Sequence, residues 1–281
     1  MKPIAEVRPS PIAGLWYSGQ PQQLALEMER YLAGAHLPEL EGKVIALIAP
    51  HAGHRYSGRT AGHAYRAIYG QSYPLVVIVS PLHAYYPAAV ITSAHSRYAT
   101  PLGEIEIDRQ AVNELAESLT FAGLALTPIA NDDEHSLEIQ LPFLQQTLAG
   151  PFKLLPLMVR SKDEKLVQVL GTALAAVVKN RSALLVASTD LSHFHTLAEA
   201  NTLDAEMLRQ IEAFSPAGVL QAEQKGSGFA CGAGAVAVVL EAARLLGGSQ
   251  VKIVHYSTSA EETGDSGSVV GYGAAVVLRR E

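Results

Sequence analysis

Residues 43–58 read KVIALIAPHAGHRYSG, a short and continuously apolar run that stops at Pro50 and His51 and breaks at Gly53. An apolar run of this length, without polar alternation, is typical of a parallel strand that is buried on both faces. Three later stretches have the same character, and they cover residues 74–81, 153–159 and 183–190. The sequence therefore predicts several buried parallel strands.

Helical patterns separate these strands, at 58–69, 108–121, 136–149, 163–179 and 198–213. Asp108 and either Ser161 or Asp163 are the expected N-caps of two of these helices. Residues 251–260 and 268–280 alternate more and are expected to pair antiparallel across a polar loop. This order predicts one α/β domain over residues 1–281, with a mostly parallel central sheet covered by helices on both faces.

The composition excludes several classes of protein. The 281 residues are 48% hydrophobic and 17% charged, with a net charge of −6 and no long run of either sign, so no nucleic-acid footprint is expected. No apolar run approaches the roughly 18 residues of a membrane span, and the first residues lack the apolar segment of a signal peptide. We therefore expect a cytoplasmic protein without a membrane segment. The single cysteine excludes an intramolecular disulfide and a Cys₄ zinc site.

Histidines follow three of the chain's apolar runs. His51 follows the first run, His83 follows the second in IVSPLHAYY, and His193 follows another in VASTDLSHF. Each one alone is explained by a hydrogen-bonded structural histidine. Because the carboxyl ends of parallel strands form one edge of a sheet, the fold is expected to bring the three together. Imidazoles at such an edge bind transition metals or move protons near neutral pH.

Asp190 and Cys231 join this set with alternatives left open. Asp190, three residues before His193, is a partner that orients a histidine, a ligand, a base or simply a cap. Cys231 precedes a strongly apolar helix, whose amino terminus would stabilise a thiolate and lower its pKa. The thiolate would be a nucleophile or a metal ligand, and the alternative is a small residue in tight glycine-rich packing.

A second polar cluster occurs in NDDEHSLEIQLPFL, residues 131–144. Its acids and Ser136 fit the start of a helix, and Glu134 and His135 also suit a pocket wall. His54, close to His51 in the chain, is a further candidate for the pocket wall.

Taken together, these segments resemble the Memo family, including the members called AmmeMemoRadiSam system protein B. The resemblance covers nearly the whole chain and rests on an ordered series of motifs: AGLWYS, PHAGHRYSG, SPLH, DDEHSLEIQLPFLQ, STDLSHF, FACGAG and TGDSGSVVGYGAAV. The sequence departs from the family where His54 replaces the usual tyrosine, at Leu82 and at residues 259–262.

The resemblance implies a fold similar to class III extradiol dioxygenases, which use non-haem iron(II). It implies metal ligands at His51, His83 and Cys231, with Asp190 and His193 lining the same pocket. It also implies a radical-SAM protein as a partner, while the substrate, a small molecule or a peptide, and the oligomeric state are not indicated.

The leading hypothesis is a metal-dependent protein with redox, dioxygenase-like chemistry, in which iron(II) is favoured and copper is possible because a thiolate is a soft ligand. His193 would be the acid/base group and Asp190 would orient it. One alternative is a metal-free hydrolase or transferase with Cys231 as nucleophile, His193 as base and Asp190 as orienter. The other is a non-enzymatic protein that binds a peptide or ligand.

Overall fold

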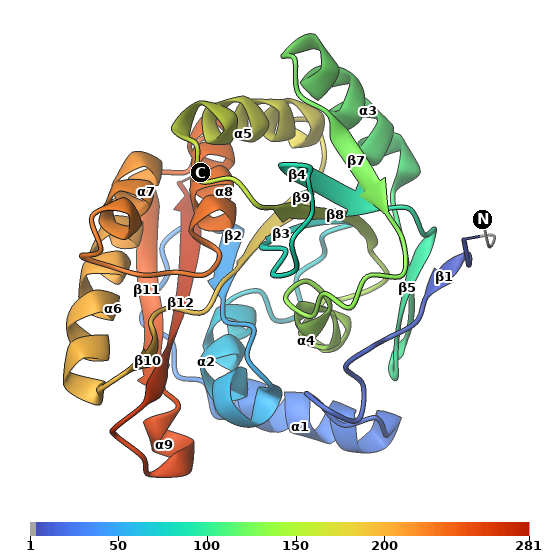
Figure 1. The fold of residues 1–281 in the computed structure, drawn as a ribbon. Coiled ribbons are helices and arrows are strands. Elements are labelled where there is room, and N and C mark those ends of the chain that lie inside the picture. Colours follow the sequence, from blue (N-terminus) through green and yellow to red (C-terminus); the bar gives the residue numbers. More distant parts are fainter. Residues whose placement is uncertain (1–3, 281) are drawn as a thin grey trace.

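Four parallel strands form the centre of the sheet, in the order β2, β9, β3, β8. The computed structural model describes residues 4–280 (Figure 1). The bounds of these strands are Lys43–Ala49 for β2, Leu75–Ser80 for β3, Lys153–Val159 for β8 and Ala183–Ser188 for β9. Almost every residue in them is buried, as expected for apolar strands covered on both faces. The four predicted parallel strands are therefore confirmed.

The sheet is mixed, because antiparallel strands flank this parallel centre. The strand order is β10-β12-β2-β9-β3-β8-β4-β7, and β11 pairs with β12. Strand β12 runs antiparallel to β2, β10 and β11, and β4 runs antiparallel to β8 but parallel to β7. The outer strands are β4 (Val90–Ser93), β7 (Leu126–Ile129), β10 (His193–His195), β11 (Gln250–Thr258) and β12 (Val269–Arg279). The predicted antiparallel pair near the end of the chain is confirmed. The sheet was expected to be mostly parallel, and this description holds for its four central strands.

A small three-stranded sheet lies beside the main one. It pairs β1 with β5 in parallel and β5 with β6 antiparallel. Its strands are β1 (Val7–Arg8), β5 (Arg97–Thr100) and β6 (Gly103–Glu106). Each of these three strands is too short and too polar to be predicted from the sequence.

Helices cover both faces of the main sheet (Figure 1). One face carries α3 (Arg109–Phe121), α5 (Glu164–Val178), α6 (Leu197–Glu212), α7 (Pro216–Gln224) and α8 (Ala233–Leu245). The other carries α1 (Pro21–Ala33), α2 (His54–Arg66) and α4 (Leu141–Thr147), and the short α9 (Ala260–Thr263) lies in the β11–β12 connection. The caps Asp108 and Asp163 accept hydrogen bonds from Ala111 N and Leu166 N, as predicted.

Two predicted helices differ from the observed ones. Helix α2 begins at His54 rather than at residue 58, so it starts immediately behind the His51 turn. The segment predicted as a helix over 136–149 forms only a 3-10 turn, Glu138–Gln140, and the short α4. The polar residues before it make long-range contacts instead of capping a helix, as described below.

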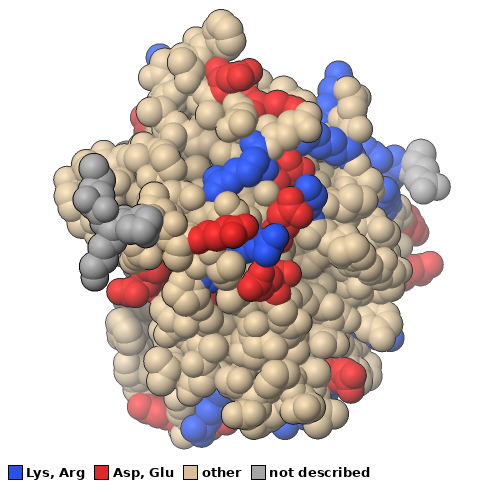
Figure 2. Space-filling view, turned by 90° about the vertical axis from the view of Figure 1, so that its right-hand side faces the viewer, with Lys and Arg blue, Asp and Glu red and all other residues tan. Residues whose placement is uncertain are grey.

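One large hydrophobic core joins the sheet to both helix layers, and a small satellite cluster contains Leu82, Ile91, Ile129 and Met158. Within residues 4–280, none of the helices combines the length and the apolar character needed to cross a bilayer. On the face shown in Figure 2, acidic and basic side chains are interspersed rather than separated by sign. This surface shows no basic stripe of the kind that follows a nucleic-acid backbone.

Candidate metal centre

Three side chains from different parts of the chain meet at the carboxyl edge of the parallel strands. His51 follows β2, His83 follows β3, and Cys231 precedes α8, which packs on these strands. Their donor atoms all lie within 4.8 Å of one another, and Cys231 Sγ lies 3.1 Å from His51 Nε2. The structure thus brings the three predicted ligands within reach of one ion, since bonds of about 2.0–2.3 Å join metals to nitrogen and sulfur.

Hydrogen bonds fix the ring of His51, which is 1% exposed. Its Nδ1 lies 3.1 Å from Ser188 Oγ, and that hydroxyl donates its proton to Ser136 O at 2.6 Å. A hydroxyl has one proton to give, so His51 Nδ1–H must be the donor in the other contact. The lone pair of Nε2 therefore points at Cys231, and Nε2 is the atom available to a metal.

Gln140 completes this buried network. Its side-chain amide donates to Ser188 Oγ at 2.8 Å and to Pro50 O at 2.9 Å, while its Oε1 accepts from Tyr65 Oη at 2.8 Å. Every polar atom of the Gln140 side chain is thus satisfied, which holds the Ser188 hydroxyl in the orientation that His51 requires.

His83 is oriented by a carboxylate. Glu134 accepts from His83 Nδ1 at 2.9 Å and from the His83 backbone N–H at 2.6 Å. Burial alone would raise the pKa of Glu134, but the hydrogen bonds and charge of His83 and the Ser136 backbone N–H lower it well below its usual value. The ionised carboxylate requires a proton on His83 Nδ1, which again leaves Nε2 for a metal.

His135 and Trp16 form a wall beside these ligands. The ring of His135 stacks on His83 at a centroid distance of 4.7 Å and also contacts the ring of Trp16, at 4.1 Å. Burial lowers the pKa of His135 to about 4, so the ring is neutral at pH 7. A donor atom of His135 also lies within 4.8 Å of donor atoms of His83 and Glu134.

Cys231 lies in the connection between α7 and α8, beside the residues that follow β9. Its Sγ accepts the Asp190 backbone N–H at 3.3 Å. The next residue must be a glycine, because a Cβ on Gly232 would lie 2.4 Å from Ser188 O. Burial and the nearby Asp190 carboxylate raise the pKa of the Cys231 thiol well above its usual value. The expectation of a lowered pKa is therefore wrong, because burial and the Asp190 carboxylate outweigh the hydrogen bonds from the Asp190 and Gly232 backbone N–H groups, which lower the pKa.

Asp190 supports His51 rather than His193. Its Oδ1 accepts the backbone N–H groups of His51 and Ala52 at 2.7 and 3.2 Å, and its Oδ2 lies 4.0 Å from His51 Nε2. Burial raises the pKa of Asp190 to about 7, although these two hydrogen bonds oppose the shift.

His193 lies in β10 and its Nδ1 lies 2.8 Å from Leu191 O, to which it donates. The expected orienting bond from Asp190 to His193 is not formed within residues 4–280, because the Leu191 carbonyl holds the ring instead. Burial lowers the pKa of His193, and the charge of His83 adds to this effect.

His54 lies away from the three candidate ligands. Its Nε2 contacts Ile139 O at 3.0 Å, and its ring stacks on Tyr17 at a centroid distance of 5.4 Å. Of the three residues expected in the pocket wall, Glu134 and His135 therefore border the centre, whereas His54 lines a neighbouring cavity.

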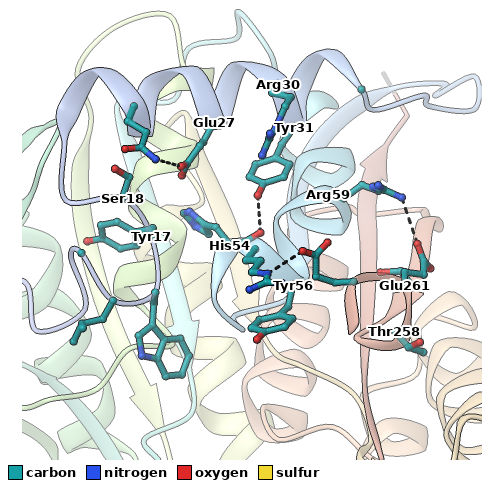
Figure 3. Close-up of a pocket in the computed structure, with 18 residues that line it drawn as sticks. Tyr17, Ser18, Glu27, Arg30, Tyr31, His54, Tyr56, Arg59, Thr258 and Glu261 are labelled. Atoms are coloured by element: carbon teal, nitrogen blue, oxygen red, sulfur yellow. Dashed lines mark hydrogen bonds and ion pairs between the residues drawn. The ribbon is translucent and has the colours of Figure 1, made fainter. Parts of the chain in front are cut away.

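That cavity, of about 790 Å³, lies between α1, the first turns of α2, the loop 14–18 and the end of β11 with α9 (Figure 3). Trp16 lines the cavity and also contacts His135, so this side chain connects the two sites. No motif in the sequence indicated this cavity, because its residues come from four separate segments.

Arg8 holds the loop that carries Glu134. The guanidinium is 1% exposed and donates to Glu138 Oε2 at 2.6 Å, to Asp132 Oδ1 at 2.9 Å and to Glu134 O at 2.8 Å. Asp132 and Glu138 therefore bind Arg8, and Glu134 binds His83, rather than cap a helix. Sequence reasoning missed Arg8, Gln140 and Ser188, because their partners are distant in the chain and follow no local spacing.

Comparison with known proteins agrees with this architecture. A family model described as "Memo-like protein" matches residues 8–276. A MEMO1 family protein of Methanosarcina mazei is 32% identical over 274 residues, which are 97% of this chain and 99% of the relative. The MEMO1 family protein MK0963 of Methanopyrus kandleri is 33% identical, over 96% of this chain and 98% of the relative.

A solved structure shares the fold. The uncharacterized protein JW3007 from Escherichia coli K12 superposes with a TM-score of 0.54 at 15% sequence identity, over 83% of this chain and 100% of that one. At this identity the likeness concerns the fold alone. The family match over nearly the whole chain, together with relatives above 30% identity, shows that this chain belongs to the Memo family.

Proposed function

We propose that this protein binds one transition-metal ion through His51 Nε2, His83 Nε2 and Cys231 Sγ and performs redox, dioxygenase-like chemistry on a small molecule or peptide. One observation carries the proposal: both imidazoles use Nδ1 for a hydrogen bond within the protein, and both Nε2 atoms remain for a ligand beside the same sulfur. This arrangement is typical of metal-binding histidines, whose second nitrogen is held by a carboxylate, carbonyl or hydroxyl.

The donor set fits iron(II), and copper is the competitor. Two imidazoles and one thiolate are softer than the two histidines and one carboxylate of many non-haem iron sites. A bound iron or copper ion would supply electron-transfer chemistry that protein side chains lack. Because metal binding requires the thiolate, the ion would displace the Cys231 proton despite the raised pKa of the free thiol.

The surrounding residues have distinct proposed roles. Ser188 and Glu134 orient the two imidazoles, and Asp190 fixes the backbone of His51 through its Oδ1. His193, anchored at Nδ1 by the Leu191 carbonyl, presents Nε2 as the proposed acid/base group. A radical-SAM protein remains the proposed partner.

Metal stoichiometry after anaerobic reconstitution tests the ligand assignment. Wild type should hold about one iron or copper ion per chain, and His51→Ala and Cys231→Ala should each lose it, because each removes one of three protein donors. His193→Ala should keep the ion and lower any turnover by about 10²–10⁴-fold. His36→Ala, which removes an exposed histidine elsewhere, is the matched control. Retention of the ion by Cys231→Ala together with its loss from His193→Ala would reverse the assignment.

A metal-free cysteine nucleophile is the second candidate, favoured by the 3.1 Å contact between Cys231 Sγ and His51 Nε2. His51, not His193, would then be the base. However, burial lowers the pKa of His51 far below its usual value, with His135 and His83 adding to the effect, and burial raises that of the thiol. Both groups are thus neutral without a metal. Rapid alkylation of metal-free protein by iodoacetamide at pH 7 would favour the nucleophile, and slow alkylation would favour the metal site.

A further inference from the structure

The cavity beside the metal centre has the size and lining of a separate ligand site. Its volume of about 790 Å³ lies within the range of small-molecule pockets, roughly 300–1,000 Å³. None of His51, His83 and Cys231 lines it. Figure 3 shows α1 above the cavity, with Glu27 and Tyr31 projecting from this helix toward His54.

Two of the cavity's arginines are neutralised by ion pairs at one end. Arg55 Nε lies 2.9 Å from Glu262, and Arg59 lies 3.4 Å from Glu261, so these pairs connect α2 to α9. All four side chains are exposed, and such pairs contribute little to stability. They close one end of the cavity without leaving a net charge there.

The other two charged residues of the lining remain without an ion pair among residues 4–280. They are Glu27, which accepts only a Gln23 amide at 3.1 Å, and Arg30, whose guanidinium lies over the Tyr31 ring at 5.2 Å. They are three residues apart on α1 and therefore lie on the same face of the helix. One unpaired anion and one unpaired cation thus face the cavity side by side.

The ring of His54 forms part of the inner wall. Its contact with the Ile139 carbonyl requires a proton on Nε2, and burial lowers its pKa to about 4, so Nδ1 carries a lone pair at pH 7. The side chain is 2% exposed and Nδ1 has no partner among residues 4–280. This nitrogen has almost no accessible surface, so a molecule in the cavity does not reach it and His54 contributes its ring to the lining.

Aromatic side chains complete the lining. Trp16 and Tyr56 are 37% and 41% exposed, and both border the cavity. Exposed aromatic rings around a concave site are typical of surfaces that contact the apolar part of a ligand.

From these features we infer that the cavity binds a small zwitterion with an apolar side chain, of the α-amino acid type. Its carboxylate would pair with Arg30 and its ammonium with Glu27. Its apolar side chain would lie against Trp16 and Tyr56. This site lies beyond the metal centre, and its occupancy does not depend on the metal.

Titration calorimetry with four compounds tests the charge requirement: L-phenylalanine, L-leucine, phenethylamine and 3-phenylpropionate. The two amino acids should bind, and the amine and the acid should bind at least about tenfold more weakly, because each lacks one charged group. Equal binding of phenethylamine or phenylpropionate would overturn the inference, and so would the absence of binding of both amino acids at millimolar concentration.

Variants then place the ligand. Glu27→Gln and Arg30→Gln should each weaken L-phenylalanine binding by about tenfold or more. Glu29→Gln is the matched control, since Glu29 is exposed on the same helix and does not line the cavity. Thermal melts and metal content should remain those of wild type for Glu27→Gln. Wild-type affinity in both Glu27→Gln and Arg30→Gln would show that this cavity is not the site.

Discussion

At the scale of single residues, the hydrogen bond made by Nδ1 of each histidine determines whether Nε2 is available to bind a metal. Ser188 and Glu134 hold Nδ1 of His51 and His83, so both rings are fixed before any ion arrives. The sequence could place these histidines at strand ends, because a strand's end is a local feature. It could not reveal Ser188 or Gln140, because their role depends on contacts between segments far apart in the chain.

Removal of the Glu134 charge should weaken metal binding without abolishing it. Glu134→Gln keeps the shape of the side chain but loses the carboxylate that orients His83 and increases its basicity. Loss of such an outer partner typically lowers metal affinity by about 10–100-fold. Competition with a chromophoric chelator measures the affinity. The control is Glu104→Gln, an exposed carboxylate of β6. An unchanged affinity for Glu134→Gln would show that His83 is not a ligand.

At the scale of elements, the loop 131–138 depends on Arg8 in β1. Arg8→Met would leave Glu138, which is fully buried, without its cation. Breaking a buried ion pair typically costs about 3–5 kcal/mol of unfolding free energy. Urea denaturation should show this loss, whereas Arg97→Met, which breaks exposed pairs, should change stability by at most about 1 kcal/mol. Similar losses in both variants would contradict the role assigned to Arg8.

The contact between α2 and β11 should be sensitive to acid. His63 and His255 stack at a centroid distance of 3.9 Å, and His255 Nδ1 lies 2.9 Å from Thr60 Oγ1. Burial and the neighbouring His63 lower the pKa of His255 to about 4, and burial also lowers that of His63. The unfolded chain then binds protons that the folded chain does not, so stability is full above about pH 6.5 and falls as the pH drops toward 4.

His255→Gln should reduce this loss. The full shift of His255 corresponds to about 3 kcal/mol, and its partial exposure reduces the expected difference to about 1–2 kcal/mol. Urea denaturation of wild type and variant at pH 7.5 and 4.5 measures it. Equal acid sensitivity of both proteins would assign the effect to other histidines.

Element types were predictable where one local pattern dominates. The central strands are continuously apolar, and Asp108 and Asp163 cap their helices as their positions indicate. Within 131–144 the expected helix start is not formed, because acids before an apolar stripe look the same whether they cap a helix or bind a distant arginine. The prediction that Asp190 orients His193 was also wrong. The acceptor is the Leu191 backbone carbonyl, and every residue has such a carbonyl, so the sequence does not indicate it.

At the scale of the whole molecule, β2, β3, β9 and α8 meet at the proposed centre, so an ion bound there would connect several parts of the fold. An ion at a hundredfold excess over its dissociation constant stabilises a protein by about 2.7 kcal/mol. Calorimetry should therefore show a higher melting temperature for wild type with iron(II) under anaerobic conditions. Cys231→Ala should show no such rise, and an equal rise in both would point to binding elsewhere.

The pairing of β12 with β2 has a consequence for folding during synthesis on the ribosome. Val44 of β2 pairs with Leu278, more than 200 residues later, so one edge of β2 lacks its neighbour throughout most of translation. At a synthesis rate of about 5–20 residues per second, this delay lasts roughly 10–50 s. During that interval an apolar edge strand is open to wrong pairing. The nascent protein should therefore be a client of ribosome-associated chaperones, and its sheet should close only after β12 has emerged from the exit tunnel.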